Sequence, residues 1–138
     1  MTTLNEANAA LYQRLNDNFS TAPFVLDNEP DGRATPVQAT GKPWVRAAVR
    51  HLERQQETLG RAPNRKYWNE GIFLLQVFTP KGEGRYTSDV LVEELRGIFE
   101  GASFDGVTVN NVLARESGPH EDEYLVVMEA AFVYYQTR

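Results

Sequence analysis

A glycine-containing segment is the first candidate for chemistry in this sequence. GIFLLQVFTPKGEG, residues 71–84, runs into Thr87-Ser88-Asp89. A strand, a glycine loop and a helix N-terminus in series can bind phosphate through backbone N–H groups. Both nucleotide signatures are absent, because Thr87 stands where a Rossmann motif has its third glycine and no Gly-Lys-Ser/Thr follows. Glu83 would also repel phosphate, so we interpret this segment as a plain turn into a helix with a hydroxyl cap.

Other catalytic and metal-binding patterns are missing as well. The sequence has no cysteine, and its two histidines, His51 and His120, lie far apart. No Gly-x-Ser-x-Gly nucleophile elbow occurs, and the acidic run 120–123 lacks the spacing of an EF-hand and is typical of a solvated turn. We therefore predict no catalytic residue, no cofactor and no metal site, and we expect a protein that is not an enzyme.

Length and composition indicate one folded unit. The 138 residues include 41% hydrophobic residues, enough for a core, and no linker divides the chain, so we predict a single domain over 1–138. The first residues lack the pattern of a signal peptide, and no apolar run reaches the roughly 20 residues that span a bilayer. We expect a soluble protein that is not secreted and has no membrane partner.

Charge is distributed unevenly along the chain. The net charge is -5, yet residues 42–66 are basic, so the rest of the chain is strongly acidic. Two faces of opposite sign favour head-to-tail contact between copies or docking on an acidic partner, although a solvated charge run is an equally good reading. Nucleic-acid binding is the alternative function, because Trp44 and Arg46 could stack bases and grip phosphates, but the acidic remainder disfavours it.

The order of elements predicts an α+β fold. Turn-rich residues 27–41 are expected to form a surface loop, and residues 116–122 a hairpin loop. Two helices on one mostly antiparallel sheet of about five strands, in the order α-β-β-β-α-β-β, is the economical arrangement. The predicted helices are 4–18, with a capping box from Thr3 to Glu6, and 87–101; the predicted strands are 23–26, one from Trp44 onward, 67–79, 107–115 and 124–135.

The segment WVRAAVRHLERQQETLG, residues 44–60, is ambiguous. As a helix it places Val45, Ala48, Val49 and Leu52 on one side and ends at Gly60. As a strand it places Val45, Ala47 and Val49 on one face and Trp44, Arg46, Ala48 and Arg50 on the other. Periodicity slightly favours the helix, and only the family resemblance below leads us to predict a strand.

Several short motifs resemble a family of small bacteriophage tail proteins of the tail-terminator or tail-completion type. The resemblance covers residues 43–135, and its motifs are structural more than chemical. The motifs are Trp44-x-Arg46, 57–61, 65–67, Gly71-x4-Gln76-Val77-Phe78-Thr79-Pro80-x-Gly82-x-Gly84, 98–101, Phe104-x-Gly106-Val107 and 132–134.

This resemblance implies an assembly role without catalysis. Members of such a family form a ring, usually of six subunits, on the head-proximal end of the tail tube, stop its growth and present a surface to the head–tail connector. The implied partners are other copies of this chain, the tail tube protein and the connector, in the virion tail and, during assembly, in the host cytoplasm. It also implies a strand from Trp44 into a hairpin arm over 57–66, although residues 51–56 lack the small residues usual at that bend.

In a ring, a basic edge of one copy can meet an acidic edge of the next. We also expect the isolated chain to be a monomer that assembles on the tube end as a template. The cations predicted to form the edge or the tube contact are Arg46, Arg50, Arg61, Arg65, Lys66, Lys81 and Arg85.

Overall fold

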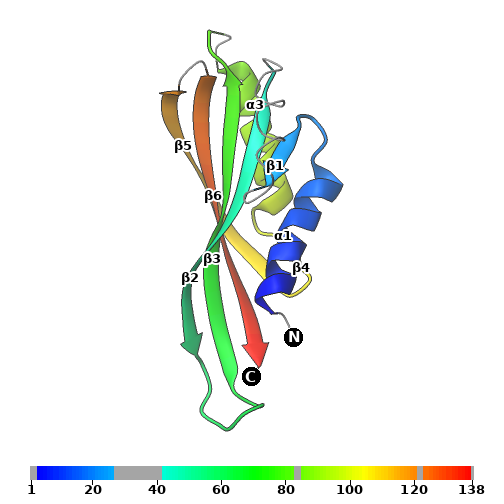
Figure 1. Cartoon of the computed structure of the whole chain (residues 1–138), viewed down its shortest axis with the longest axis vertical. Helices are drawn as coiled ribbons and strands as arrows, with labels where there is room; N and C mark the ends of the chain where they lie inside the picture. Colours follow the sequence, from blue (N-terminus) through cyan, green and yellow to red (C-terminus); the bar gives the residue numbers. More distant parts are fainter. Residues whose placement is uncertain (1–2, 27–41, 83–84, 121–122, 138) are drawn as a thin grey trace.

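A computed structural model shows, over the residues that it describes, two helices packed on one side of a strongly twisted six-stranded sheet (Figure 1). It describes residues 3–26, 42–82, 85–120 and 123–137. The expected loop over 27–41 therefore lies outside the described residues. The elements are α1 (Leu4–Asn18), β1 (Phe24–Leu26), β2 (Trp44–Gln56), β3 (Lys66–Pro80), α3 (Tyr86–Phe99), β4 (Ser103–Phe104), β5 (Val107–His120) and β6 (Glu123–Thr137).

The sheet has the order β1-β2-β3-β6-β5-β4. Among the described strands, β1 is parallel to its neighbour β2, and the other pairs are antiparallel. The predicted α+β class and the mostly antiparallel sheet are confirmed. The strand count is six instead of about five, because the two-residue strand β4 is too short to leave a pattern in the sequence.

The segment from Trp44 is a strand, as predicted against its helical periodicity. Its first half pairs with β3 in regular antiparallel register, and Val45 and Ala47 are buried under the helices. The register shifts between His51 and Glu53, and this bulge exchanges the faces to which odd and even residues point. Leu52 completes the apolar side of the alternative helix, but in the structure its side chain is 60% exposed at this bulge.

Gly71 allows the Arg50 carbonyl group of β2 and the Phe132 ring of β6 to pack closely against β3. A Cβ atom at this position would lie 2.6 Å from the Phe132 ring and would clash with the carbonyl oxygen of Arg50. Phe132 is fully buried in the core. The glycine therefore follows from the sheet packing at this point.

Both helices begin near their predicted positions, but their caps differ. Thr3 Oγ1 accepts a hydrogen bond from the Glu6 backbone N–H at 3.3 Å, so the predicted cap of α1 is confirmed. The predicted hydroxyl cap of α3 is wrong, because Arg85 is the N-cap residue and no side chain caps this helix. The buried Ser88 hydroxyl donates to the Arg85 carbonyl oxygen at 3.0 Å instead.

The hairpin loop predicted over 116–122 is longer than the loop in the structure, and residues 121–122 lie outside the described residues. Strand β5 continues to His120 through a register shift between Glu116 and Gly118. Gly118 has a φ of 82°, which suits an irregular strand. Proline 119 is tolerated because β4 covers only the other end of β5, so this stretch of β5 is a sheet edge.

Candidate assembly surfaces

The first candidate surface is an arm that continues the sheet beyond the helices. We define the arm as residues 51–70 together with 133–137 of β6, which pair with β3 down to Thr137. Figure 1 shows its hairpin end as the tip of the molecule remote from β1 and α3. Residues 51–64 are all exposed. The arm is thus a three-stranded projection with a surface available to partners.

Arg54 ties the three strands of the arm together. Its Nη1 donates to Asn69 Oδ1 on β3 at 2.9 Å and to Gln136 Oε1 on β6 at 2.8 Å. The guanidinium also lies over the Tyr67 ring, 4.3 Å from its centroid. Asn69 is buried, whereas the Arg54 side chain and its bond to Gln136 are exposed. These contacts stiffen the arm without an apolar core of its own.

The tip of the arm is basic and carries one exposed leucine. Lys66 pairs with Glu57 at 3.3 Å, and its ammonium lies 4.2 Å from the centroid of the Tyr135 ring. The Lys66 backbone N–H donates to Thr58 Oγ1 at 2.9 Å and helps to close the hairpin. Leu59 is 98% exposed beside exposed Arg61. A leucine so exposed at the end of an ordered arm is suited to contact another molecule.

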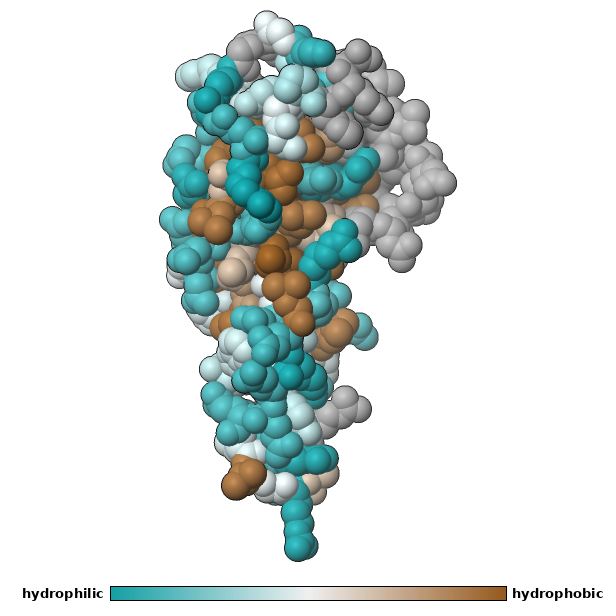
Figure 2. Space-filling view, turned by 90° about the vertical axis from the view of Figure 1, so that its left-hand side faces the viewer, coloured by the Kyte–Doolittle hydropathy of each residue, from teal (hydrophilic) through white to brown (hydrophobic). Residues whose placement is uncertain are grey.

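The second surface is the side of the sheet turned away from the helices. Cross-strand register places Ile72 beside Ala131 and Leu74 in a row with Glu129 and Leu113. Leu113 is 60% exposed. Figure 2 shows hydrophobic residues gathered on this side of the molecule above the hydrophilic arm. We define the outer patch as Ile72, Leu74, Leu113 and Ala131.

Two arginines border the outer patch on β2. Arg50 is exposed and pairs in register with Ile72. Arg46 lies over the stacked rings of Trp44 and Phe78, 5.2 and 5.7 Å from their centroids. Arg115, on the other side, is paired with Glu129. The β2 side of the outer patch therefore carries two positive charges, and the carboxylates of Glu53 and Glu70 follow them where the arm begins.

The third surface is the exposed side of α3. At 100° per residue, Tyr86, Val90, Glu93 and Gly97 form one stripe opposite the buried residues of the helix. Tyr86 is 80% exposed and Val90 43% exposed. We define the α3 surface as this stripe together with Asp89.

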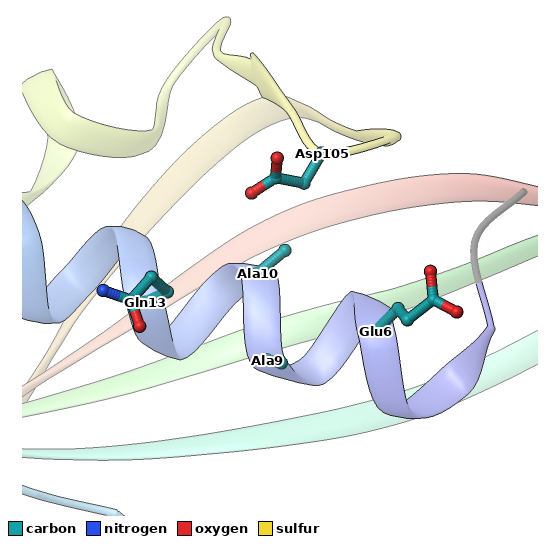
Figure 3. A pocket seen from close by; sticks show the side chains of 5 residues that line it. All are labelled: Glu6, Ala9, Ala10, Gln13 and Asp105. Atoms are coloured by element: carbon teal, nitrogen blue, oxygen red, sulfur yellow. The ribbon is translucent and has the colours of Figure 1, made fainter.

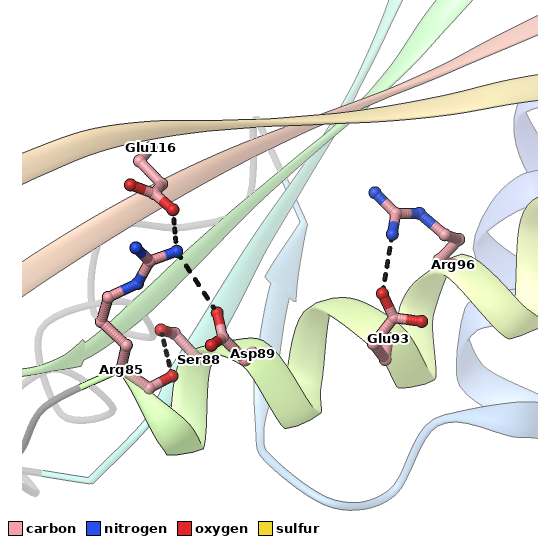
Figure 4. A network of polar contacts seen from close by, with 6 residues as sticks. All are labelled: Arg85, Ser88, Asp89, Glu93, Arg96 and Glu116. Atoms are coloured by element: carbon pink, nitrogen blue, oxygen red, sulfur yellow. Dashed lines mark hydrogen bonds and ion pairs between the residues drawn. The ribbon is translucent and has the colours of Figure 1, made fainter.

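The α3 surface has an excess of negative charge. Figure 4 shows Arg85 between Asp89 and Glu116, and Arg96 bound to Glu93. Segment 85–100 holds the carboxylates of Asp89, Glu93, Glu94 and Glu100 against the guanidinium groups of Arg85 and Arg96. Apolar side chains in an acidic setting complement the outer patch with its flanking arginines.

The seven predicted interface cations do not form one patch. Arg46 and Arg50 border the outer patch, whereas Arg61, Arg65 and Lys66 lie at the tip of the arm. Lys81 follows β3 at the other end of the molecule, and Arg85 beside it is bound to carboxylates. Charge alone did not point to the exposed apolar residues Leu59, Leu113, Tyr86 and Val90. The helical spacing of Tyr86, Val90, Glu93 and Gly97 is a sequence signal for the last two.

The structure removes the aromatic part of the predicted nucleic-acid site. Trp44 is 1% exposed and stacks on Phe78, with ring centroids 4.3 Å apart. Its Nε1–H donates to Glu123 Oε2 at 2.7 Å. A buried indole that is already hydrogen bonded to a carboxylate cannot stack on a base.

Two carboxylates face each other across the arm. Glu53 and Glu70 are register partners, and a hydrogen bond with Glu53, together with desolvation and charge repulsion, raises the pKa of Glu70. Burial against Phe132 and Tyr134 lowers the pKa of His51, whose Nε2 lies 2.8 Å from Asn8 Oδ1. Both pKa shifts are explained by packing and pairing within the sheet, and neither one points to a catalytic role.

A shallow groove of about 390 Å³ lies between α1 and the turn after β4. Figure 3 shows the short side chains of Ala9 and Ala10 along the helix, with Glu6, Gln13 and Asp105 around them. None of the five lining residues is a histidine or a hydroxyl nucleophile. Within the described ranges no three histidine or acidic residues cluster as metal ligands would, and no helix is long and apolar enough to cross a membrane.

Comparison with known proteins decides the family. The family model described as phage tail terminator protein matches residues 6–125. The chain belongs to the phage tail terminator family. A phage tail terminator is a structural protein of the virion tail, so this chain has a structural role in phage tail assembly. The resemblance inferred from the short motifs is confirmed.

A solved structure supports the same fold for this terminator. It is 19% identical and superposes with a TM-score of 0.71 over 97% of this chain and 96% of the other chain. At this identity the likeness establishes the fold alone. No curated protein sequence matches this chain significantly.

Proposed function

We propose that this protein closes the head-proximal end of the tail tube as a ring, stops tube growth, and offers the surface to which the head–tail connector binds. The observation that carries the proposal is the family match over residues 6–125. The fold supports it, because the chain carries an arm braced by Arg54 and several exposed apolar residues that suit contacts with other proteins. A protein of this kind acts through surface complementarity.

The tip of the arm is our candidate for the tube contact. Arg61, Arg65 and Lys66 supply positive charge there, and Leu59 supplies an apolar anchor. The bonds of Arg54 hold the arm in shape before binding, which lowers the entropy cost of docking. Lys81 and Arg85 lie at the other end of the molecule and are placed to meet the connector.

The ring size in this proposal is six, and the free chain is a monomer. A weak contact between copies becomes effective when the tube end holds several copies side by side and so raises their effective concentration. Sedimentation of the isolated chain at micromolar concentration should give the 15.6 kDa monomer. A tight ring in the absence of tail components would contradict this part of the proposal.

Imaging of tails tests the function directly. Tails assembled without the protein should have tubes of uncontrolled length, and added protein should give a cap of density at one end and a narrow length distribution. Arg61→Glu with Arg65→Glu should abolish capping, whereas the matched Arg61→Lys with Arg65→Lys variant should retain it. Equal tube lengths with and without the protein would refute the proposed function.

A further inference from the structure

The outer patch and the α3 surface lie on different sides of the fold. Helix α3 packs on the sheet through Leu91, Leu95 and Phe99, so its exposed stripe faces away from the sheet. The outer patch lies on the sheet face that the helices leave uncovered. The two surfaces share no residue, and one molecule cannot bring its own outer patch against its own α3 surface.

The two surfaces complement each other in charge. Arg46 and Arg50 border the outer patch, while segment 85–100 carries more carboxylates than cations and places Asp89 and Glu93 on the exposed stripe. Each surface also presents exposed apolar side chains, Leu113 on the sheet and Tyr86 with Val90 on the helix. An apolar centre with complementary charges around it is the usual composition of a specific protein interface.

Small residues help the two surfaces to approach. A Cβ atom added at Gly97 would meet nothing within 4 Å, so the stripe has a flat position beside Glu93. Ala131 is exposed near the centre of the outer patch, with Ile72 as its register partner. A helix can therefore lie on this part of the sheet without a large side chain between them.

We propose that the outer patch of one copy binds the α3 surface of the next copy, and that this sheet-on-helix contact joins neighbouring subunits of the ring. This inference deepens the proposed function and rests on it. The contact joins two different surfaces, so it is heterologous and repeats from copy to copy until a ring closes. The arm remains free in this arrangement to reach the tube.

Two variants that each destroy one surface provide the sharpest test. Leu113→Glu alters the outer patch and leaves the α3 surface intact, and Val90→Asp does the reverse. Both side chains are exposed, so the changes spare the core. Each variant should weaken self-association by on the order of tenfold to a hundredfold, because a leucine or valine buried in a contact contributes about that much.

A mixture of the two variants distinguishes a heterologous contact from a symmetric one. Each Leu113→Glu copy can still offer its α3 surface to the intact outer patch of a Val90→Asp copy. At millimolar concentration, far above the micromolar range in which the free chain is a monomer, the mixture should therefore form a one-to-one dimer and stop there, as measured by sedimentation equilibrium. Leu4→Glu, which also alters an exposed leucine, is the matched control and should assemble like the unaltered chain.

Cross-linking supplies a second measurement on a chain that has no native cysteine. The double variant Leu113→Cys with Val90→Cys, treated with a bismaleimide on tube ends, should give a ladder of covalent oligomers. Each single cysteine variant should stay monomeric.

The outcomes separate this inference from the proposed function. Rings that still form on tubes with both surface variants would overturn the sheet-on-helix contact and leave the capping function standing. Dimers from a single cysteine variant would also overturn it, because they require a symmetric contact. A ladder from the double variant, together with the stopped dimer in the mixture, would establish the contact.

Discussion

Replacing Gly71 by alanine tests the packing at the middle of the sheet. The added Cβ would lie 2.6 Å from the Phe132 ring and would clash with the Arg50 carbonyl oxygen. The ring belongs to a fully buried side chain, and the carbonyl belongs to a neighbouring strand, so neither can move far. The methyl group must be accommodated by shifting β2 away from β3.

The expected cost follows from these contacts. Adding a methyl group to a closely packed site costs about 1–3 kcal/mol and occasionally more, and contact with backbone places Gly71→Ala near the upper end, about 3 kcal/mol. For a domain of this size each kcal/mol shifts Tm by about 3–5 °C, so we expect a fall of about 10 °C.

Gly97→Ala is the matched control, since it makes the same chemical change in the opposite setting. Gly97 lies inside α3, where an added Cβ meets nothing within 4 Å. Alanine should stabilise the helix there by about 0.5–1 kcal/mol, a rise in Tm of a few degrees. Differential scanning calorimetry of the three proteins at one pH measures both shifts.

The result that refutes the reasoning is a Gly71→Ala protein that melts at or above the temperature of the unaltered chain. Such a protein would show that the strands can separate at no cost. A destabilised Gly97→Ala protein would show instead that the exposed side of α3 is covered in the isolated chain.

Three further predictions concern buried or bridging groups. Glu123→Ala leaves the Trp44 Nε1–H without its acceptor and should lower the unfolding free energy by about 1–3 kcal/mol, measured by urea denaturation, whereas Glu123→Gln keeps an acceptor and should lose less. Arg54→Ala removes the bonds between β2, β3 and β6 and should speed amide hydrogen exchange in the arm by about 5–30-fold. The control Gln55→Ala should leave the exchange rates unchanged. Equal exchange in both variants would exclude a bridging role for Arg54. Folding lowers the pKa of His51, so the stability that neutral His51 contributes is present above the usual pKa of histidine and is lost as the pH falls through the pKa of the folded state. The Tm of His51→Gln should therefore fall less between pH 7.5 and pH 5 than the Tm of the unaltered chain. An equal fall in both proteins would contradict this assignment.

Long regular elements could be predicted from the sequence, because their signals are local. The capping box at Thr3 and the apolar face of Leu11 and Leu15 give α1 its observed bounds. The apolar run from Ile72 to Phe78 predicts a central strand, and β3 has neighbours on both sides. The ambiguous segment from Trp44 needed the family resemblance, because the bulge after His51 mimics a helical period.

Features set by tertiary contacts could not be predicted in this way. The clash that makes Gly71 necessary involves Arg50 and Phe132, which come from two other strands. The exposed position of Leu113 depends on a register shift between Val109 and Val112, which the alternation of residues does not reveal. The charge of residues 42–66 predicts one basic surface, but the twist and length of the hairpin separate Arg46 from Arg61.

The tip of the arm and the far end of the molecule belong to the same strands. The 15 residues of β3 extend over about 50 Å at the usual rise per residue, and β6 runs beside them for its full length. Two continuous, paired strands therefore connect the two ends of the molecule, and no domain boundary lies between them. If the arm docks on the tube as proposed, strain at its tip would reach Lys81 through these two strands alone.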